Sequence, residues 1–210
     1  MEKVDRTHWE RAELFEFFSA VSHPFYSVTF RVDVTNLYRY VKERHLSFYY
    51  AMGYLVTDAV NSVKNFRYAI RDGEVWLLDE RIPSLTDLKP GSEQFHIVTL
   101  PKVGGIAEFC ASAQARSAAQ KTLLDQDEEN DNLIYISCTP WFDLTGCTNE
   151  RDLTGTTTSP ASHGADMARK MAARNWGCRW RSITASSTVS IWGNSTRNYR
   201  PTSTHYKEAF

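Results

Sequence analysis

The stretch SFYYAMGYLVTDAVNSVK, residues 47–64, decides the fold class of this 210-residue chain. It is mostly apolar and longer than an ordinary strand, so it predicts a long helix that is buried on most of its faces. FRYAI (66–70) and EVWLL (74–78) follow it, and the turn residues Arg71-Asp72-Gly73 between them predict a β-hairpin. A buried helix followed by a hairpin indicates a fold in which helices and strands intermix.

The flanking segments extend this mixture in both directions. Apolar spacing and β-branched alternation predict helices at 8–20, 35–42 and 106–120, strands at 26–34 and 95–100, an acidic loop at Asp125–Asp131, and a buried strand opening 133–146. Thr35 is the expected N-cap of the second helix. Together these elements predict one domain, an α/β sandwich with a mixed sheet.

Composition excludes several classes of protein. With 42% hydrophobic residues and a formal net charge of −1, the chain is neither disordered nor electrostatically suited to nucleic acid. The charged first residues form no secretory signal, and the apolar run Phe48–Val60 is too short to span a bilayer. We therefore expect a soluble, cytoplasmic protein. The four cysteines form no CxxC pair, which predicts free thiols and no metal site.

The composition changes abruptly near residue 153. Residues 154–210 hold eight Lys or Arg against two acids, 17 Ser or Thr, and no Leu. Three interpretations fit this segment: a basic arm for nucleic acid, a disordered extension, or a segment that was never selected as protein.

Known catalytic motifs are missing from the sequence. It contains no Gly-rich phosphate loop, no GxSxG elbow and no helical pair of histidines at metal-ligand spacing. The cluster Phe15, Phe17 and Phe18 fits either a core or a ligand pocket. From the residues alone, the prediction ends at a soluble α/β domain with an aromatic interior.

Ordered blocks of residues 8–153 resemble the chloramphenicol acetyltransferases. The matching blocks are HWER (8–11), TFRVDVT (29–35), SFYYAMGYLVTDAVN (47–61), FRYAI (66–70), DERIPSLT (79–86), SEQF (92–95) and ISCTPWFDLTG (136–146). The resemblance implies an α/β two-layer sandwich with a mixed β-sheet, of the CoA-dependent acyltransferase type. It also implies a homotrimer with active sites between subunits, and transfer of acetyl from acetyl-CoA to the 3-hydroxyl of chloramphenicol.

This chain departs from the family at the catalytic base. The family base is the second histidine of an HHxxxDG motif near the C-terminus, because an alcohol needs a base near its proton to attack a thioester. No HHxxxDG is present here; its histidine would fall at about the position of Ile183. We therefore assign no catalytic residue and expect the chain as it stands to be inactive.

A shifted reading frame explains the missing motif. Reading residues 182–195 from the third base of the Ser182 codon, permissible codons give HHSIVDGFHMGKF. The glycine after the methionine is forced, since Trp192 is TGG and Gly193 begins with GG. We therefore expect a frame slip near Leu153–Thr156. Residues 1–153 are then the acetyltransferase core, and 154–210 belong to the same domain but are out of frame and poorly folded. On this interpretation the basic residues of the segment follow from codons, so no nucleic-acid partner is expected.

Further site residues follow from the resemblance. Arg11 matches an arginine that pairs with the motif's aspartate, a structural role; the alternative is an exposed helix charge. The aromatic positions that line the antibiotic pocket are matched by Phe17, Phe18, Phe25 and Phe95, with ordinary core packing as the alternative. Thr86 and Ile97 fall in pocket-forming stretches.

This chain also departs from the family at the residue that stabilises the oxyanion. Gly146 stands where many members carry an oxyanion-stabilising serine, and Thr145 is the nearest hydroxyl that could donate or bind substrate. Two hypotheses of different class follow. Either the gene encodes a chloramphenicol O-acetyltransferase, or the chain is a catalytically dead relative with at most residual antibiotic binding or oligomerisation.

Overall fold

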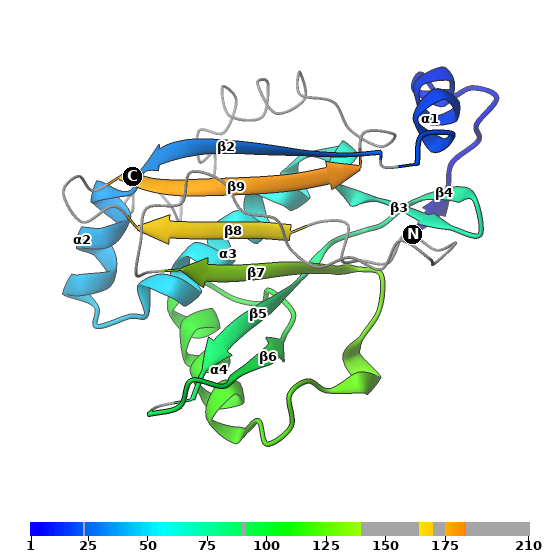
Figure 1. Cartoon of the computed structure of the whole chain (residues 1–210). Coiled ribbons are helices and arrows are strands. Elements are labelled where there is room, and N and C mark those ends of the chain that lie inside the picture. Colours follow the sequence, from blue (N-terminus) through cyan, green and yellow to red (C-terminus); the bar gives the residue numbers. More distant parts are fainter. Residues whose placement is uncertain (23, 90, 140–163, 170–174, 184–210) are drawn as a thin grey trace.

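The computed structural model describes residues 1–22, 24–89, 91–139, 164–169 and 175–183. A six-stranded sheet dominates the molecule (Figure 1). In spatial order its strands are β2 (Phe25–Asp33), β9 (Asn175–Ile183), β8 (Gly164–Arg169), β7 (Leu133–Thr139), β5 (Ile82–Leu88) and β6 (Phe95–Thr99). β7 runs parallel to β5 and β8, whereas the other neighbours are antiparallel. The predicted mixed sheet is confirmed.

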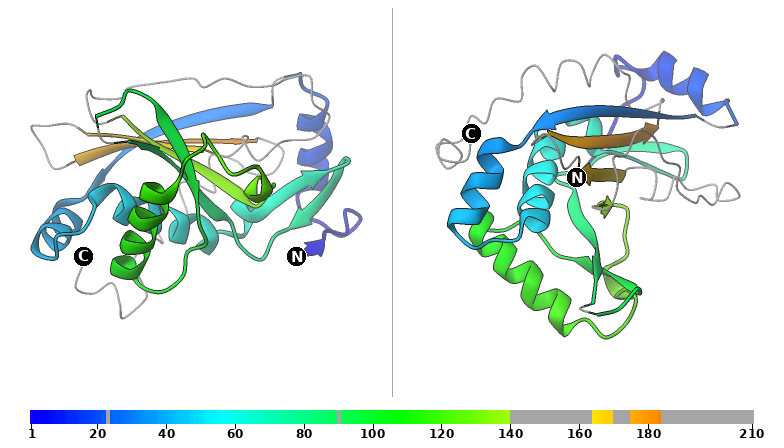
Figure 2. Two further views of the ribbon diagram at one scale, coloured as in Figure 1. Left: turned by 90° about the horizontal axis from the view of Figure 1, so that it is seen from below. Right: turned by 60° about the vertical axis from the view of Figure 1, so that its left-hand side comes forward.

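Three helices form the second layer of the sandwich. They are α2 (Thr35–Glu43), α3 (Phe48–Ser62) and α4 (Ile106–Ala119). Figure 2 shows all three on the same side of the sheet. The core between the layers includes Leu37, Ala51, Phe109, Leu85 and Ile136, each at most 1% exposed. The long apolar helix is therefore buried against the sheet, as its sequence predicts.

A smaller sheet adjoins one end of the large one. It consists of β1 (Glu2–Lys3), β4 (Glu74–Leu77) and β3 (Tyr68–Arg71), with helix α1 (Ala12–Ser19) nearby. Asp72 and Gly73 both have positive φ, as the central residues of a tight hairpin turn require. The predicted hairpin is confirmed. Phe15, Tyr68 and Val75 form a separate buried cluster there.

Several element boundaries differ from the sequence prediction. The first helix begins at Ala12 rather than residue 8, because the Asp5 carboxylate instead holds a turn by accepting from the Thr7 amide and hydroxyl. Thr35 is not the N-cap of α2: Val34 occupies that position, and Asp33 accepts from the Thr35 amide. The long helix ends at Ser62 rather than residue 64, and a short 3₁₀ helix, Lys64–Arg67, takes the first two residues of the predicted strand 66–70, so that β3 begins at Tyr68. A second 3₁₀ helix, Gln126–Glu128, lies within the predicted acidic loop.

Two strands of the large sheet come from beyond residue 153. β8 and β9 lie between β2 and β7, and β9 pairs with β2 along its whole length. β5, which the sequence analysis did not assign as a strand, holds the other side of the sheet by pairing with both β6 and β7. The end of β9 thus lies beside the start of β2.

Candidate functional site

The expected position of the missing histidine is at one end of the sheet. Ile183 is the last residue of β9 and pairs with Phe25, the first residue of β2. Figure 1 shows α1 and the β3–β4 hairpin at this same end. We call it the hairpin end, after the β3–β4 hairpin. Phe25, an expected pocket residue, is therefore next to the expected position of the catalytic base.

Arg11 is buried at the hairpin end. It occupies the N-cap position of α1 and is only 8% exposed. Its Nε and Nη2 atoms have no hydrogen-bond acceptor among the residues that the structure describes. Burial lowers the pKa of the Arg11 guanidinium, an effect that the charge of Glu10 partly offsets. The expectation of an exposed helix charge is wrong, and Arg11 is a buried cation without a bonded partner in the described part of the chain.

Trp9 ties the segment before α1 to the hairpin. Its indole Nε1 donates to the hydroxyl oxygen of Tyr68 at 3.1 Å. The two rings also meet edge to face, with centroids 5.2 Å apart. Because Tyr68 is the first residue of β3, this contact fixes the position of the N-terminal segment, and with it Arg11, against the hairpin.

Arg81 links the hairpin to the large sheet. It is 2% exposed, and its guanidinium donates to three main-chain carbonyls: Phe66 at 3.0 Å, Tyr68 at 2.6 Å and Asp131 at 2.5 Å. Burial lowers its pKa to about 10, and the nearby Asp131 carboxylate opposes that effect. A fully buried charge is tolerated because every part of the guanidinium has an acceptor.

A second arginine, Arg71, binds the side chain of Asp131. Arg71 donates to both of its carboxylate oxygens, and the Arg71 Nη2 to Asp131 Oδ1 distance is 2.6 Å. The hydrogen bond from Arg71 lowers the pKa of the Asp131 carboxyl below its ordinary value. The pair joins the end of β3 to the segment that leads into β7, so it stabilises the same end of the sheet.

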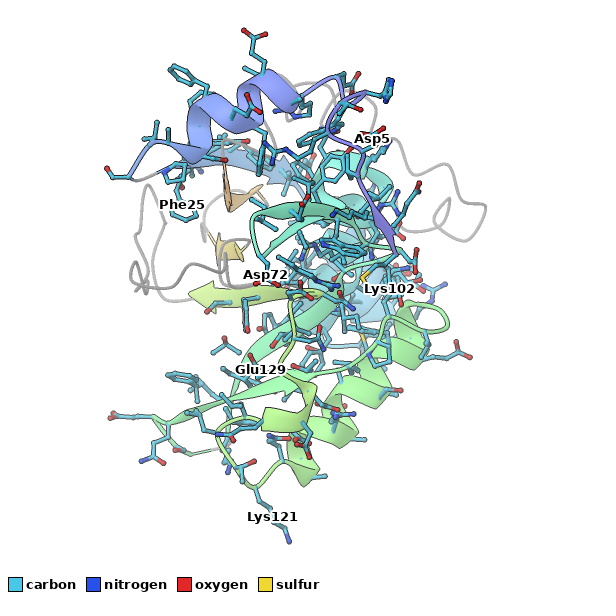
Figure 3. The ribbon with its side chains drawn as sticks, turned by 90° about the vertical axis from the view of Figure 1, so that its right-hand side faces the viewer. Asp5, Phe25, Asp72, Lys102, Lys121 and Glu129 are labelled. Carbon is cyan, nitrogen blue, oxygen red and sulfur yellow. The ribbon has the colours of Figure 1, made fainter. Side chains whose placement is uncertain are left out.

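Three of the expected pocket aromatics lie together at the hairpin end. Phe17 is 67% exposed, and its ring meets that of Phe18 edge to face at 5.1 Å. Phe18 and Phe25 pack against the small cluster around Phe15. Figure 3 shows Phe25 beside α1. The exposure of Phe17 excludes ordinary core packing within one chain, so its ring is available to a ligand or a partner.

Phe95 lies far from the other three aromatics. It begins β6 at the opposite edge of the sheet, where it pairs with Leu88 and is 51% exposed. Five strand steps separate β2 from β6, and at about 4.8 Å a step this is roughly 24 Å. Thr86 and Ile97 face each other on β5 and β6 near Phe95. One chain therefore does not bring all the expected pocket residues together.

Other expected residues lie outside the described part. Thr145 and Gly146 fall between residues 139 and 164, and Ile183 has a described backbone position only. The sequence analysis missed the roles of Trp9, Tyr68, Arg81 and Asp131. Arg81 directly precedes a strand, where an arginine is usually exposed, and no local signal marks its burial.

Among the described residues, no group of three or more His, Cys, Asp or Glu side chains is placed to hold a metal ion. In the same part of the chain, no helix has the length and apolar character needed to cross a bilayer.

Sequence comparisons point to one family. The family model described as chloramphenicol acetyltransferase matches residues 1–158. A chloramphenicol acetyltransferase of Clostridium perfringens is 30% identical over 149 residues, which is 69% of this chain and 70% of that protein. Chloramphenicol acetyltransferase 3 of Escherichia coli is 30% identical over 145 residues, covering 68% of each protein.

Solved structures share the fold. A chloramphenicol acetyltransferase superposes with a TM-score of 0.82 at 20% identity, covering 94% of this chain and 97% of that one. A truncated catalytic core of the 2-oxoacid dehydrogenase complex from Thermoplasma acidophilum gives a TM-score of 0.60 at 12% identity, covering 94% and 95%. The fold of this chain is thus shared with both of these structures.

Proposed function

This chain belongs to the chloramphenicol acetyltransferase family, and from that we propose that its gene specifies an enzyme that moves acetyl from acetyl-CoA to the 3-hydroxyl of chloramphenicol. We further propose that this chain itself does not catalyse the transfer, because the codons for its base are read out of frame. Both substrates are small molecules, and the supply of acetyl-CoA places the reaction in the cytoplasm.

The reaction requires one proton acceptor. As the 3-hydroxyl oxygen of the antibiotic attacks the thioester carbonyl, the base takes its proton and a tetrahedral oxyanion forms. Collapse of the oxyanion breaks the carbon–sulfur bond, and the base returns the proton to the leaving CoA thiolate. In the restored frame that base is the second histidine of HHSIVDG. Without a positioned base the rate falls by about 10²- to 10⁴-fold.

The pairing of Phe25 with Ile183 carries this proposal. In the restored frame the motif's histidines fall at about Ile183, where β9 ends. The strand therefore delivers the base to the hairpin end, beside the aromatic side chains of Phe17, Phe18 and Phe25. Aromatic rings suit the nitrophenyl group of the antibiotic by stacking and by burial of apolar area.

The surroundings of Arg11 give independent support. Nearly every buried polar group in a folded protein has a hydrogen-bond partner, so a buried guanidinium with two unpaired nitrogens is unusual. In the restored frame the motif's aspartate follows the histidines by a few residues, shortly after the end of β9 in the sequence. Arg11 and that aspartate are then a pair, and the shifted frame removes the acceptor but leaves the donor.

We also propose that the active enzyme is a homotrimer with a shared pocket. Phe95 lies across the sheet from Phe17, so the two rings line one pocket only if different copies of the chain contribute them. Both rings are more than half exposed, which a subunit contact would explain. A head-to-tail contact between two different patches closes into a ring, consistent with three subunits.

Resequencing the coding DNA from codon 145 to the stop tests the shifted frame. The proposal predicts a one-base difference near codon 154 that brings HHSIVDGFHMG into frame. An unchanged frame in independent isolates would instead support the second candidate function. In that case the chain is a catalytically dead relative that keeps antibiotic binding or oligomerisation at most. The absence of HHxxxDG from this sequence is the observation that favours that candidate.

A further inference from the structure

Arg11 presents a hydrogen-bonding edge that has no acceptor among the residues that the structure describes. The two unpartnered nitrogens, Nε and Nη2, are the pair that point the same way along one side of a guanidinium. Two parallel N–H groups at this spacing match the two oxygens of a carboxylate. Since the side chain is 8% exposed, these donors are also largely removed from water. Burying two donors without an acceptor lowers the stability of the folded chain, and binding of an acceptor restores that free energy.

The charge of Arg11 is also only partly compensated by the groups that the structure describes. The described groups that influence it electrostatically are Glu10, Tyr26 and Tyr68. Glu10 is exposed, and none of the described hydrogen bonds joins it to Arg11. Arg11 further stands at the start of the eight-residue helix α1, where the helix dipole favours an anion.

The sequence beyond β9 offers little to neutralise this charge. Residues 184–210 contain a single acidic side chain, Glu208, and three Lys or Arg. The segment after β9 therefore supplies few carboxylates that could compete with an acceptor from solution.

We propose that Arg11 of this chain binds a small monocarboxylate, such as formate or acetate, through the Nε–Nη2 edge. The low exposure of Arg11 selects for the smallest anions, and the partly buried setting strengthens a charge-assisted bidentate contact relative to water. A chloride ion satisfies the charge but not the two parallel donors. The site therefore discriminates formate from chloride at equal ionic strength. This binding does not depend on the acetyl transfer proposed above.

Thermal unfolding of the full chain in sodium formate and in sodium chloride, at pH 7 and matched ionic strength, tests the site. We expect a saturable rise in Tm in formate only, of about 3 to 6 °C at ten times Kd. The variant Arg11→Met keeps the length of the side chain but has no donors, and its Tm does not respond to formate. Arg11→Lys keeps the charge but loses the paired donors, and it responds weakly. Arg39→Met, at an exposed arginine of α2, is the matched control and responds as the parent does.

Because Arg11→Met removes an unpaired buried charge, we expect it to fold at least as well as the parent chain. Line broadening of ¹³C-formate in NMR spectra of the parent and of Arg11→Met measures binding without an unfolding transition.

Equal Tm values in formate and chloride with no line broadening would overturn the proposal, as would an equal formate response in Arg11→Met. A response that disappears at high protein concentration assigns the donors to a carboxylate of a second copy, and this also overturns it. Acetyl transfer is not measured in any arm, so failure here is distinct from failure of the proposed enzyme.

Discussion

Phe25 and Ile183 pair with each other at the point where β2 begins and β9 ends. This pairing places a residue expected in the substrate pocket beside the position at which the family's catalytic histidine is missing. Arg11, buried at the N-cap of α1, adds to the hairpin end a cation that has no bonded partner among the described residues.

Arg11→Met is expected to change stability in opposite directions in the two reading frames. In this chain it removes a buried unpaired charge, so the free energy of unfolding rises, by about 1–3 kcal/mol. In the restored frame it leaves the motif's aspartate without its partner, and the free energy of unfolding falls by a similar amount. Urea unfolding of the four proteins measures both differences. The same sign in both frames would contradict the pairing of Arg11 with the motif.

Complementation tests the shared pocket. In the restored frame, Phe17→Ala and Phe95→Ala each reduce the apparent affinity for chloramphenicol, because each removes one wall of every site. In randomly mixed trimers of the two variants, about one quarter of the sites combine an intact Phe17 from one copy with an intact Phe95 from the next. We expect that fraction of parental activity to return on co-expression. No recovery would place both rings in one subunit's site, or in none.

The thiols of Cys110 and Cys138 are expected to resist modification in the folded chain. Burial raises the pKa of each to about 11, so very little thiolate is present at pH 8. Cysteine alkylation at pH 8, followed by peptide mass mapping, should leave both residues unlabelled without denaturant and label them in 6 M guanidinium chloride. Rapid labelling of Cys110 in the native chain would contradict the packing of α4 on the sheet.

The Arg71–Asp131 pair predicts a loss of stability in acid. Arg71 holds the pKa of the folded Asp131 carboxyl below the ordinary value of 3.8. A carboxyl with a depressed folded pKa contributes stability above its unfolded pKa, and the contribution is lost as the pH falls through the folded value. Between pH 7 and pH 3 the parent chain should therefore lose more stability than Asp131→Asn, whose side chain does not titrate. Parallel pH profiles for the two proteins would exclude this contribution.

The local sequence pattern predicted those parts of the fold that depend on residues close together in the sequence. The apolar run of α3 required burial, and Asp72-Gly73 supplied the positive φ values that the hairpin turn needs. Arg81 could not be predicted in the same way. Its burial depends on the carbonyls of Phe66, Tyr68 and Asp131, which come from segments that are adjacent only after folding.

The candidate site shows the same division. The resemblance identified Arg11 and the aromatic positions, since these are carried by short motifs. Their spatial relationship depends on the order of strands in the sheet, which separates Phe95 from Phe17 and which no single motif encodes. The lack of a bonded partner for Arg11 is visible only in three dimensions, because it depends on which acceptors reach the guanidinium.

The most direct test of the central claim is acetyl transfer by a matched pair of proteins. One is this chain, and the other is encoded with a single base inserted between codons 153 and 156, which brings HHSIVDG into frame. Release of CoA thiol from acetyl-CoA, with and without chloramphenicol, is measured for both. We predict chloramphenicol-dependent turnover by the restored protein. For this chain we predict a rate that is lower by about 10²- to 10⁴-fold, or no detectable rate. Turnover by this chain at a comparable rate, or an inactive but folded restored protein, would contradict it.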